Sequence, residues 1–233
     1  MNHIGTLQEG SLHAALKEWV GLPGDQFEVK VDGSIIDIVR GELLIEIQTA
    51  NFMAIKRKLG RLTHDHPLRL IYPIAREKWI VRLDADGKTQ LSRRKSPKRG
   101  RVEQLFMELV YVARLVTHAN LTLEVVFIRE EEVWVKARDR RRHWRNKGWL
   151  RHDRRLIDVI DHLVLQTPDD FRAMIPPALP DTFTNSELAE ALGVPRYLAE
   201  RMSYSFRQMG VLEQAGKRSR SMLLKRTEPG TTA

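Results

Sequence analysis

Alternating apolar and polar positions over residues 34–49 predict a β-hairpin. Two short apolar runs flank residues 40–42, and side chains on each run alternate with a period of two. With a two-residue loop at positions 40 and 41, Asp37 would lie opposite Leu44. One face of this hairpin is apolar, and the other carries Asp37, Glu46 and Gln48. Burying unpaired carboxylates is costly, so a cation held between the two acids is the simplest compensation.

The flanking chain has periodicities that give the order of its other elements. Apolar residues recur at helical spacing over 7–20 and 51–62, residues 27–31 alternate as a strand, and residues 67–74 form an apolar run typical of a buried strand. The predicted order is therefore helix, three strands, helix and strand. The fold class is α/β in the broad sense, or α+β, with a mixed sheet.

The next part of the chain continues this mixture of helices and strands. We expect strands at 77–84, 121–129 and 132–136, an acidic turn at 130–131, and apolar helices at 102–117 and 156–165. Residues 166–181 contain four prolines and predict a linker between two domains. The predicted domains cover residues 1–165 and 182–228, followed by a disordered tail at 229–233.

Positive charge gathers in the middle of the chain. The formal net charge is +9, and residues 93–155 carry 18 basic and 8 acidic side chains, whereas the flanking regions are nearly balanced. A local excess of this kind predicts a polyanion-binding surface, although a solvated basic loop is the alternative. It falls in a flexible basic loop at 92–101 and a basic arm at 138–155.

The basic arm interleaves cations with aromatic residues. Arginine grips phosphate through a planar fork, and tryptophan offers a stacking face to unpaired bases. Alternatively, the tryptophans anchor the arm to the core while the arginines face water. The candidate nucleic-acid-binding residues in the arm are Arg140, Arg141, Arg142, Trp144, Arg145, Lys147 and Trp149.

Composition limits the setting in which the protein works. The chain has no cysteine, which excludes disulfides and thiolate metal sites and suits a reducing compartment. No apolar run reaches the roughly 18 residues of a membrane-spanning helix, and the N-terminus lacks the pattern of a secretory signal. We expect a cytoplasmic protein without a membrane partner.

The hairpin and its surroundings resemble the PD-(D/E)XK nuclease superfamily. Asp37 matches the first acid of the motif and Glu46-Ile47-Gln48 matches its second part, with glutamine where lysine is usual. The resemblance implies a restriction-endonuclease-like α-β-β-β-α-β core. It also implies that Asp37, Glu46 and the Ile47 carbonyl bind Mg²⁺ or Mn²⁺, and that Gln48 orients the attacking water.

Two neighbouring helices offer further candidates. Glu9 lies near the centre of the apolar face of the first helix and resembles the superfamily's first-helix glutamate. Its alternative place is a solvated first helical turn, where acids are favoured. Lys56 and Lys58 on the second helix are candidates to supply the positive charge that Gln48 lacks.

The C-terminal part resembles the winged helix-turn-helix family. A capped helix from Thr184, a turn at 193–195, a second helix from Arg196 and a basic hairpin follow one another. The resemblance implies DNA contacts by the helix that begins at Arg196 and by the hairpin tip. Winged helices also mediate protein contacts. The tip residues are Lys217, Arg218 and Arg220.

These features lead to one expected function and one alternative. The expected function is a metal-dependent DNA nuclease that hydrolyses phosphodiester bonds. The alternative is a non-catalytic DNA-binding protein, regulatory or architectural, on a nuclease-like scaffold. RNA is the less favoured partner, and a homodimer stays open because nucleases of this type often dimerise to cut both strands.

Overall fold

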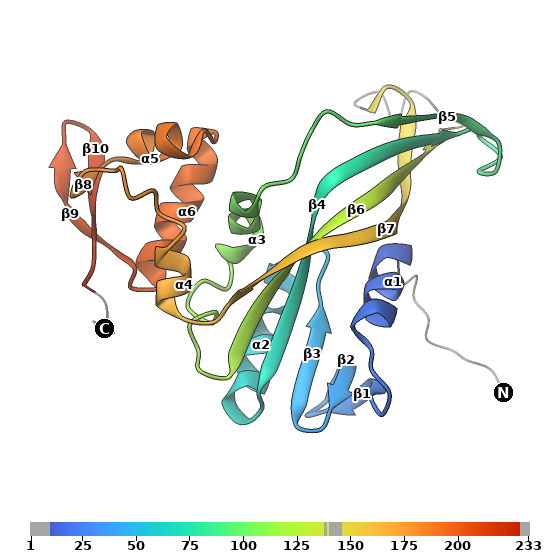
Figure 1. The fold of residues 1–233 in the computed structure, drawn as a ribbon, viewed down its shortest axis with the longest axis horizontal. Helices are drawn as coiled ribbons and strands as arrows, with labels where there is room; N and C mark the ends of the chain where they lie inside the picture. Colours follow the sequence, from blue (N-terminus) through green and yellow to red (C-terminus); the bar gives the residue numbers. More distant parts are fainter. Residues whose placement is uncertain (1–9, 138, 140–145, 229–233) are drawn as a thin grey trace.

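The computed structural model describes residues 10–137, 139 and 146–228 (Figure 1). Within these residues, a seven-stranded mixed sheet has the order β1-β2-β3-β4-β6-β7, with β5 (Gln90–Lys95) also paired to β4. Strands β3, β4 and β6 are mutually parallel, and the other neighbours in this sheet are antiparallel. The mixed α and β architecture that the sequence predicts is confirmed.

The predicted order of the first six elements is also found. They are α1 (Ser11–Val20), β1 (Gln26–Val31), β2 (Ser34–Arg40), β3 (Leu43–Ile47), α2 (Phe52–Asp65) and β4 (Leu68–Leu83). Gly10 is the N-cap of α1 and Gly21 its C-cap. Residues 7–9 of the predicted first helix lie outside the described residues. Asn51 caps α2 by accepting a hydrogen bond from the Ala54 amide.

Long strands replace several of the predicted short ones. β4 and β6 (Leu68–Leu83 and Leu121–Lys136) are unbroken 16-residue strands, and the acidic turn predicted at 130–131 is wrong. The charged residues that interrupt the apolar pattern stay within the strands because neighbouring strands supply opposite charges. Lys78, for example, pairs with Glu130 from the adjacent strand.

The helix predicted at 156–165 is wrong, because these residues belong to the 17-residue strand β7 (Trp149–Leu165). Three register irregularities between β6 and β7 break the period of two that would have identified a strand. The apolar positions then recur in pairs that imitate helical spacing.

The helix predicted at 102–117 is much shorter in the structure. A 3₁₀ turn at Val102–Leu105 leads into α3 (Phe106–Leu109), and turns follow. Bonds of the 3₁₀ type, such as Val112 N–H to the Leu109 carbonyl, satisfy that following backbone. Burial of the apolar side chains therefore does not require a regular helix here.

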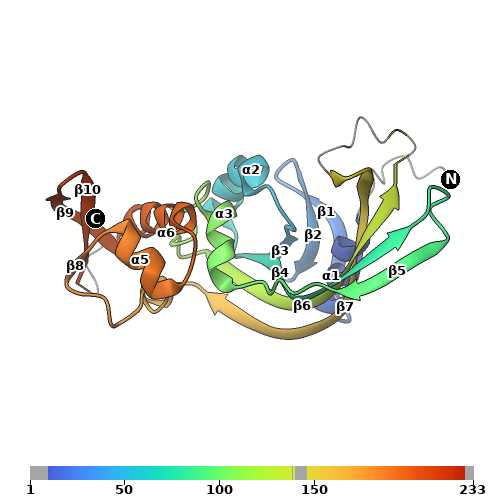
Figure 2. The same cartoon turned by 90° about the horizontal axis from the view of Figure 1, so that it is seen from above.

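Alternate residues of β3 pack on opposite sides of the sheet. Leu44 packs with Leu59 and Leu62 of α2, whereas Ile45 and Ile47 pack with Leu12 and Leu16 of α1. Glu46 therefore falls on the side that α2 covers. Figure 2 shows the curved sheet with α2 and α3 on one side.

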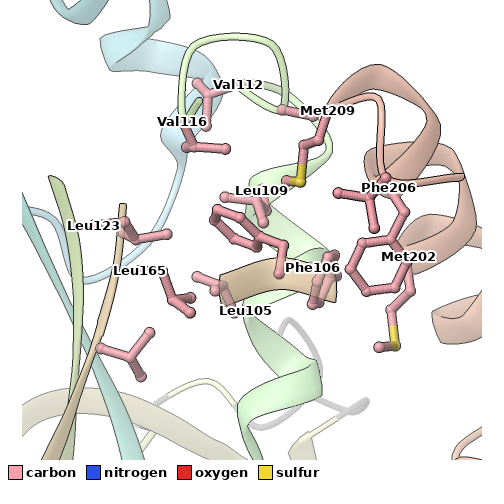
Figure 3. Packing of buried hydrophobic residues seen from close by; sticks show 14 of the residues in the cluster. Leu105, Phe106, Leu109, Val112, Val116, Leu123, Leu165, Met202, Phe206 and Met209 are labelled. Carbon is pink, nitrogen blue, oxygen red and sulfur yellow. The ribbon is translucent and has the colours of Figure 1, made fainter. Parts of the chain in front are cut away.

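The C-terminal part packs directly against this core. It contains α4 (Pro168–Arg172), β8 (Thr182–Phe183), α5 (Asn185–Leu192), α6 (Arg196–Gln208), β9 (Leu212–Arg218) and β10 (Ser221–Arg226). Phe106 of α3 meets Phe206 of α6 edge to face, with ring centroids 5.0 Å apart (Figure 3). Phe171 and Ile175 of the Pro-rich segment are buried in the same cluster, and the division into two domains stays a prediction.

Candidate functional site

The hairpin brings its two acids close together, because Asp37 and Glu46 lie just beyond the last paired residues and the charge of Asp37 acts on Glu46. Arg40 pairs with Leu43 and Ile38 with Ile45. The loop is therefore Gly41-Glu42, and the predicted register, with Asp37 opposite Leu44, is wrong by two residues. The physical reason is Gly41, whose φ of 56° suits a position that other residues adopt at a cost.

Asp37 is held by two donors. Its Oδ2 accepts a 2.8 Å hydrogen bond from the Ile47 amide and lies 3.2 Å from Nε2 of His13 on α1. Burial raises the pKa of this carboxyl, but the hydrogen bonds from His13 and Ile47 outweigh that effect and leave the pKa below its ordinary value. Asp37 is therefore ionised at neutral pH.

Glu46 has the opposite character. It is only 4% exposed, and its carboxylate pairs with the ammonium group of Lys58, which also donates to the Ile35 carbonyl. Burial and the negative charge of Asp37 raise the pKa of Glu46 to about 7, although Lys58 acts in the other direction. A single lysine does not fully compensate two adjacent acids.

This arrangement fits a hard divalent cation. Mg²⁺ is commonly bound by one or two carboxylates together with substrate phosphates rather than by a complete protein cage. Two neighbouring carboxylates supply that donor set. Across the described ranges, no group of three or more His, Cys, Asp or Glu side chains could hold a metal ion, so substrate oxygens would complete the coordination.

The comparisons with known proteins place the chain in a family. Residues 10–166 match the model of a domain of unknown function, DUF8091. The chain belongs to the DUF8091 family. An uncharacterized protein of Treponema pallidum (strain Nichols) is 31% identical over 229 residues, which cover 97% of this chain and 89% of that protein. No solved structure matches.

Two cavities in the DUF8091 region border the segment that follows the hairpin. The larger, of about 600 Å³, is bordered by β4, β6, β7 and the basic residues Arg94, Lys98 and Arg99. The smaller, of about 280 Å³, lies between α1 and β7 and includes His13. Thr49, one residue beyond Gln48, lines both cavities. A largely basic surface therefore begins at Thr49, three residues after Glu46.

A compensated ion-pair cluster lies in the larger cavity. Glu130 is 0% exposed and pairs with Lys78 at 3.0 Å and with Arg154 at 2.7 Å. Glu132 also pairs with Lys78 and accepts a 2.8 Å hydrogen bond from the Trp134 indole. Two acids and two bases balance one another here, in contrast to the Asp37–Glu46 pair.

The basic loop of the DUF8091 region is fixed to the sheet. Residues 92–95 belong to β5 (Gln90–Lys95), so the flexible loop predicted at 92–101 is wrong for its first half. The Gly100 amide then donates to the Ala75 carbonyl at 2.9 Å. A Cβ atom at position 100 would lie 2.4 Å from that carbonyl oxygen, so the close approach requires glycine. Arg94, Lys98 and Arg99 are therefore presented on an anchored segment.

The other predicted site residues are distributed over the molecule. The Gln48 side-chain amide donates to the Ala50 carbonyl, so its own turn holds it. Lys147 and Trp149 line a third cavity, at the far end of the sheet. Glu9, Arg140, Arg141, Arg142, Trp144 and Arg145 lie outside the described residues.

The winged-helix candidates lie on the C-terminal part. Arg196 begins α6 and pairs with Glu200 at 3.0 Å. Lys217, Arg218 and Arg220 lie at the β9–β10 hairpin, where Arg218 pairs with Glu187 at 2.8 Å. One face of α6 is buried, with Met202 and Phe206 packed inside, whereas Tyr197 and Tyr204 are exposed. Over the described ranges, no helix combines the length and apolar character needed to cross a membrane.

Sequence reasoning missed His13 and the cluster around Glu130. His13 carries no local signal because only the folded sheet brings α1 beside Asp37. A signal for Glu130 was present, since acids at positions 130 and 132 continue the alternation of a strand that leads to Trp134. Interpreting the acidic run as a turn hid it.

Proposed function

We propose that the protein is a metal-dependent nuclease that hydrolyses phosphodiester bonds in DNA. The observation that carries the proposal is the pair of neighbouring acids on β2 and β3, whose charges act on each other, with Lys58 of α2 at Glu46. A buried pair with an excess of negative charge favours a bound cation. Lysine beside a carboxylate pair is also the residue combination of the PD-(D/E)XK superfamily, although here the lysine comes from the neighbouring helix.

The arrangement of elements supports the same assignment. The order α1-β1-β2-β3-α2-β4 around the two acids resembles a restriction-endonuclease-like core. In the C-terminal part, two helices followed by a hairpin, with β8 paired to β10, resemble a winged helix. We propose that this second part contributes DNA contacts through Lys217 and Arg220.

Each side chain of the site has its own role in the proposed reaction. Asp37 and Glu46 would hold the ion, which when bound lowers the pKa of water and neutralises charge at the phosphate. His13 and the Ile47 amide fix the Asp37 carboxylate. Lys58 supplies the positive charge that Gln48 does not provide. Arg94, Lys98 and Arg99 bind the DNA backbone, since arginine and lysine donate to phosphate oxygens.

Cleavage assays with matched variants test the proposal. Purified protein is incubated with single-stranded, double-stranded and branched DNA in Mg²⁺ or Mn²⁺. We expect cleavage by the wild type and a loss of at least about a thousand-fold in Asp37→Asn and Glu46→Gln. Glu42→Gln, in the exposed turn of the same hairpin, should cut like the wild type. Absence of cleavage on every DNA, or equal cleavage by Asp37→Asn, would overturn it.

A second candidate is a non-catalytic DNA-binding protein. Its favouring observation is that both acids already have partners inside the protein, His13 for Asp37 and Lys58 for Glu46. This candidate predicts DNA affinity that falls with salt but survives chelation of metal and the Asp37→Asn substitution. Failure to bind DNA at low salt would rule it out.

A further inference from the structure

Two tryptophans line a cavity at the end of the sheet remote from α2. Trp134 of β6 and Trp149 of β7 border a space of about 260 Å³, together with Arg82, Arg94 and Lys147. The space is smaller than the two cavities that border Thr49, and both its rings belong to paired strands. Aromatic rings and cations thus border the same cavity.

Each ring has a contact that fixes its orientation. The Trp134 indole N–H donates to Glu132 at 2.8 Å. The Arg82 guanidinium lies over the Trp149 ring, 4.7 Å from its centroid. These contacts hold the rings at the cavity without filling it.

The two rings are not part of an apolar core. Arg82 pairs with Trp134 across β4 and β6, and Val81 pairs with Val133 one position away. Because side chains alternate, the apolar cluster of Val81, Leu83 and Val133 occupies the opposite face of the sheet. On the tryptophan face, Ile80 is the one other apolar side chain among the described residues that line the cavity, and the remaining lining residues are polar or charged, so an apolar cluster does not explain two large aromatic residues here.

The tryptophan cavity continues into the surface that begins at Thr49. It shares Ile80, Arg94 and Glu132 with the larger cavity, which reaches Thr49 next to the hairpin. Arg82 lies ten positions after Tyr72 along β4, a length of roughly 30 Å at the rise of a strand. A nucleic-acid strand bound along this surface would contact the basic side chains of the larger cavity before it reaches the two rings.

We infer that the cavity between Trp134 and Trp149 stacks an unpaired base, so that the substrate is DNA with a single-stranded segment. The inference rests on the proposed function for the nature of the polymer. In a duplex, the faces of the bases are covered by their neighbours, whereas a single strand can offer a face to an indole ring. The cations around the rings hold the adjoining phosphates.

Binding measured without metal tests the inference separately from cleavage. Fluorescence anisotropy compares a labelled thymidine 15-mer with an abasic 15-mer of equal charge, in EDTA. We expect the thymidine strand to bind more tightly. Trp134→Leu and Trp149→Leu should each weaken its binding about tenfold, and Trp149→Phe should retain most of the affinity. None of these variants should change binding of the abasic strand.

Trp79→Leu is the matched control. Trp79 lies on β4, but it pairs with Glu131 and Lys95 and so faces the other side of the sheet. This variant should bind like the wild type. Quenching of the wild-type tryptophan fluorescence by the thymidine strand, and not by the abasic strand, gives a second measurement that needs no variant. Equal affinity for the two strands, or unchanged binding by both leucine variants, would overturn the inference.

The two proposals fail in distinguishable ways. If cleavage depends on Asp37 but DNA binding does not depend on Trp134 or Trp149, the nuclease proposal stands and the stacking site is ruled out. Tryptophan-dependent binding without cleavage of any DNA would retain the stacking site and remove the nuclease.

Discussion

Two buried glutamates on one sheet have opposite surroundings. Glu130 is 0% exposed and lies between Lys78 and Arg154, with Glu132 completing a balanced set of two acids and two bases. Glu46 is 4% exposed and shares one lysine with Asp37. Burial alone therefore does not separate the acid that we propose to be functional from the one held in a balanced cluster. The two differ in the local balance of charge.

The difference has a physical consequence for each cluster. When one partner of a balanced buried ion pair is removed, the protein loses several kcal/mol of stability, roughly 3 to 5, because the remaining charge is left uncompensated. Glu46, whose pKa is raised by burial and by Asp37, is only partly compensated by Lys58, so removing its charge relieves repulsion. We therefore expect the Glu130 cluster to stabilise the sheet and the Asp37–Glu46 pair to bind a cation.

The largest expected effect comes from Glu130→Gln. This substitution leaves Lys78 and Arg154 with one acid between them and should lower the free energy of unfolding by roughly 3 to 5 kcal/mol. Glu46→Gln should leave the free energy of unfolding unchanged or raise it at pH 8. Urea unfolding of both variants measures the difference. Equal losses in the two variants would remove the contrast between the clusters.

The pH dependence of stability in the metal-free protein comes next. The pKa of Glu46 is about 7 in the folded chain and 4.5 ordinarily, so the folded state binds more protons between these values. The free energy of unfolding should therefore fall as pH rises from 4.5 to 7, by about 3 kcal/mol from this residue. Urea unfolding in EDTA across this range should show a shallower decline in Glu46→Gln. Parallel profiles would contradict the assignment.

Removing the lysine at the pair should have a smaller effect. Lys58 lowers the pKa of Glu46, so Lys58→Met should raise that pKa and extend the decline in stability above pH 7. At pH 8 we expect a loss of about 2 kcal/mol, since a hydrogen bond to a charged group disappears. Lys56→Met, on the same helix, is the control and should change little. A loss in both variants would point to helix α2 rather than to the pair.

The smallest expected effect belongs to the basic residues of the larger cavity. Lys98→Ala and Arg99→Ala should leave stability within about 0.5 kcal/mol of the wild type. Each should reduce the slope of log affinity for DNA against log salt by about 1, because one phosphate contact is lost. Anisotropy titrations at several salt concentrations measure the slope. An unchanged slope in both variants would show that DNA does not contact the basic residues of the larger cavity.

The sequence predicted those features that depend on local pattern. The period-two alternation located β2 and β3, and helical spacing located α2 with Lys58, which was named as a candidate because it neighbours the motif. The predicted pairing of β2 with β3 was wrong by two residues. The turn lies at 41–42 rather than at 40–41, and its position depends on Gly41. The two acids are neighbours as predicted, but Asp37 contacts His13 of α1 and Glu46 contacts Lys58 of α2.

Features that depend on distant partners could not be predicted in the same way. The charged residues near the middle of β4 and β6 interrupt the apolar pattern, and their partners come from strands far along the chain. His13 reaches Asp37 only through the packing of α1 on the sheet. In β7, irregular pairing with β6 disguised a strand as a helix. Each miss arises where tertiary contacts override local periodicity.

The central claim is that Asp37 and Glu46 form a cation site, and calorimetry tests it most directly. Mg²⁺ and Mn²⁺ are titrated into the wild type, Glu46→Gln and the turn control Glu42→Gln, with and without a short DNA duplex. The account predicts binding by the wild type and by Glu42→Gln and loss of binding in Glu46→Gln. No binding by the wild type, or binding that Glu46→Gln leaves intact, would contradict it.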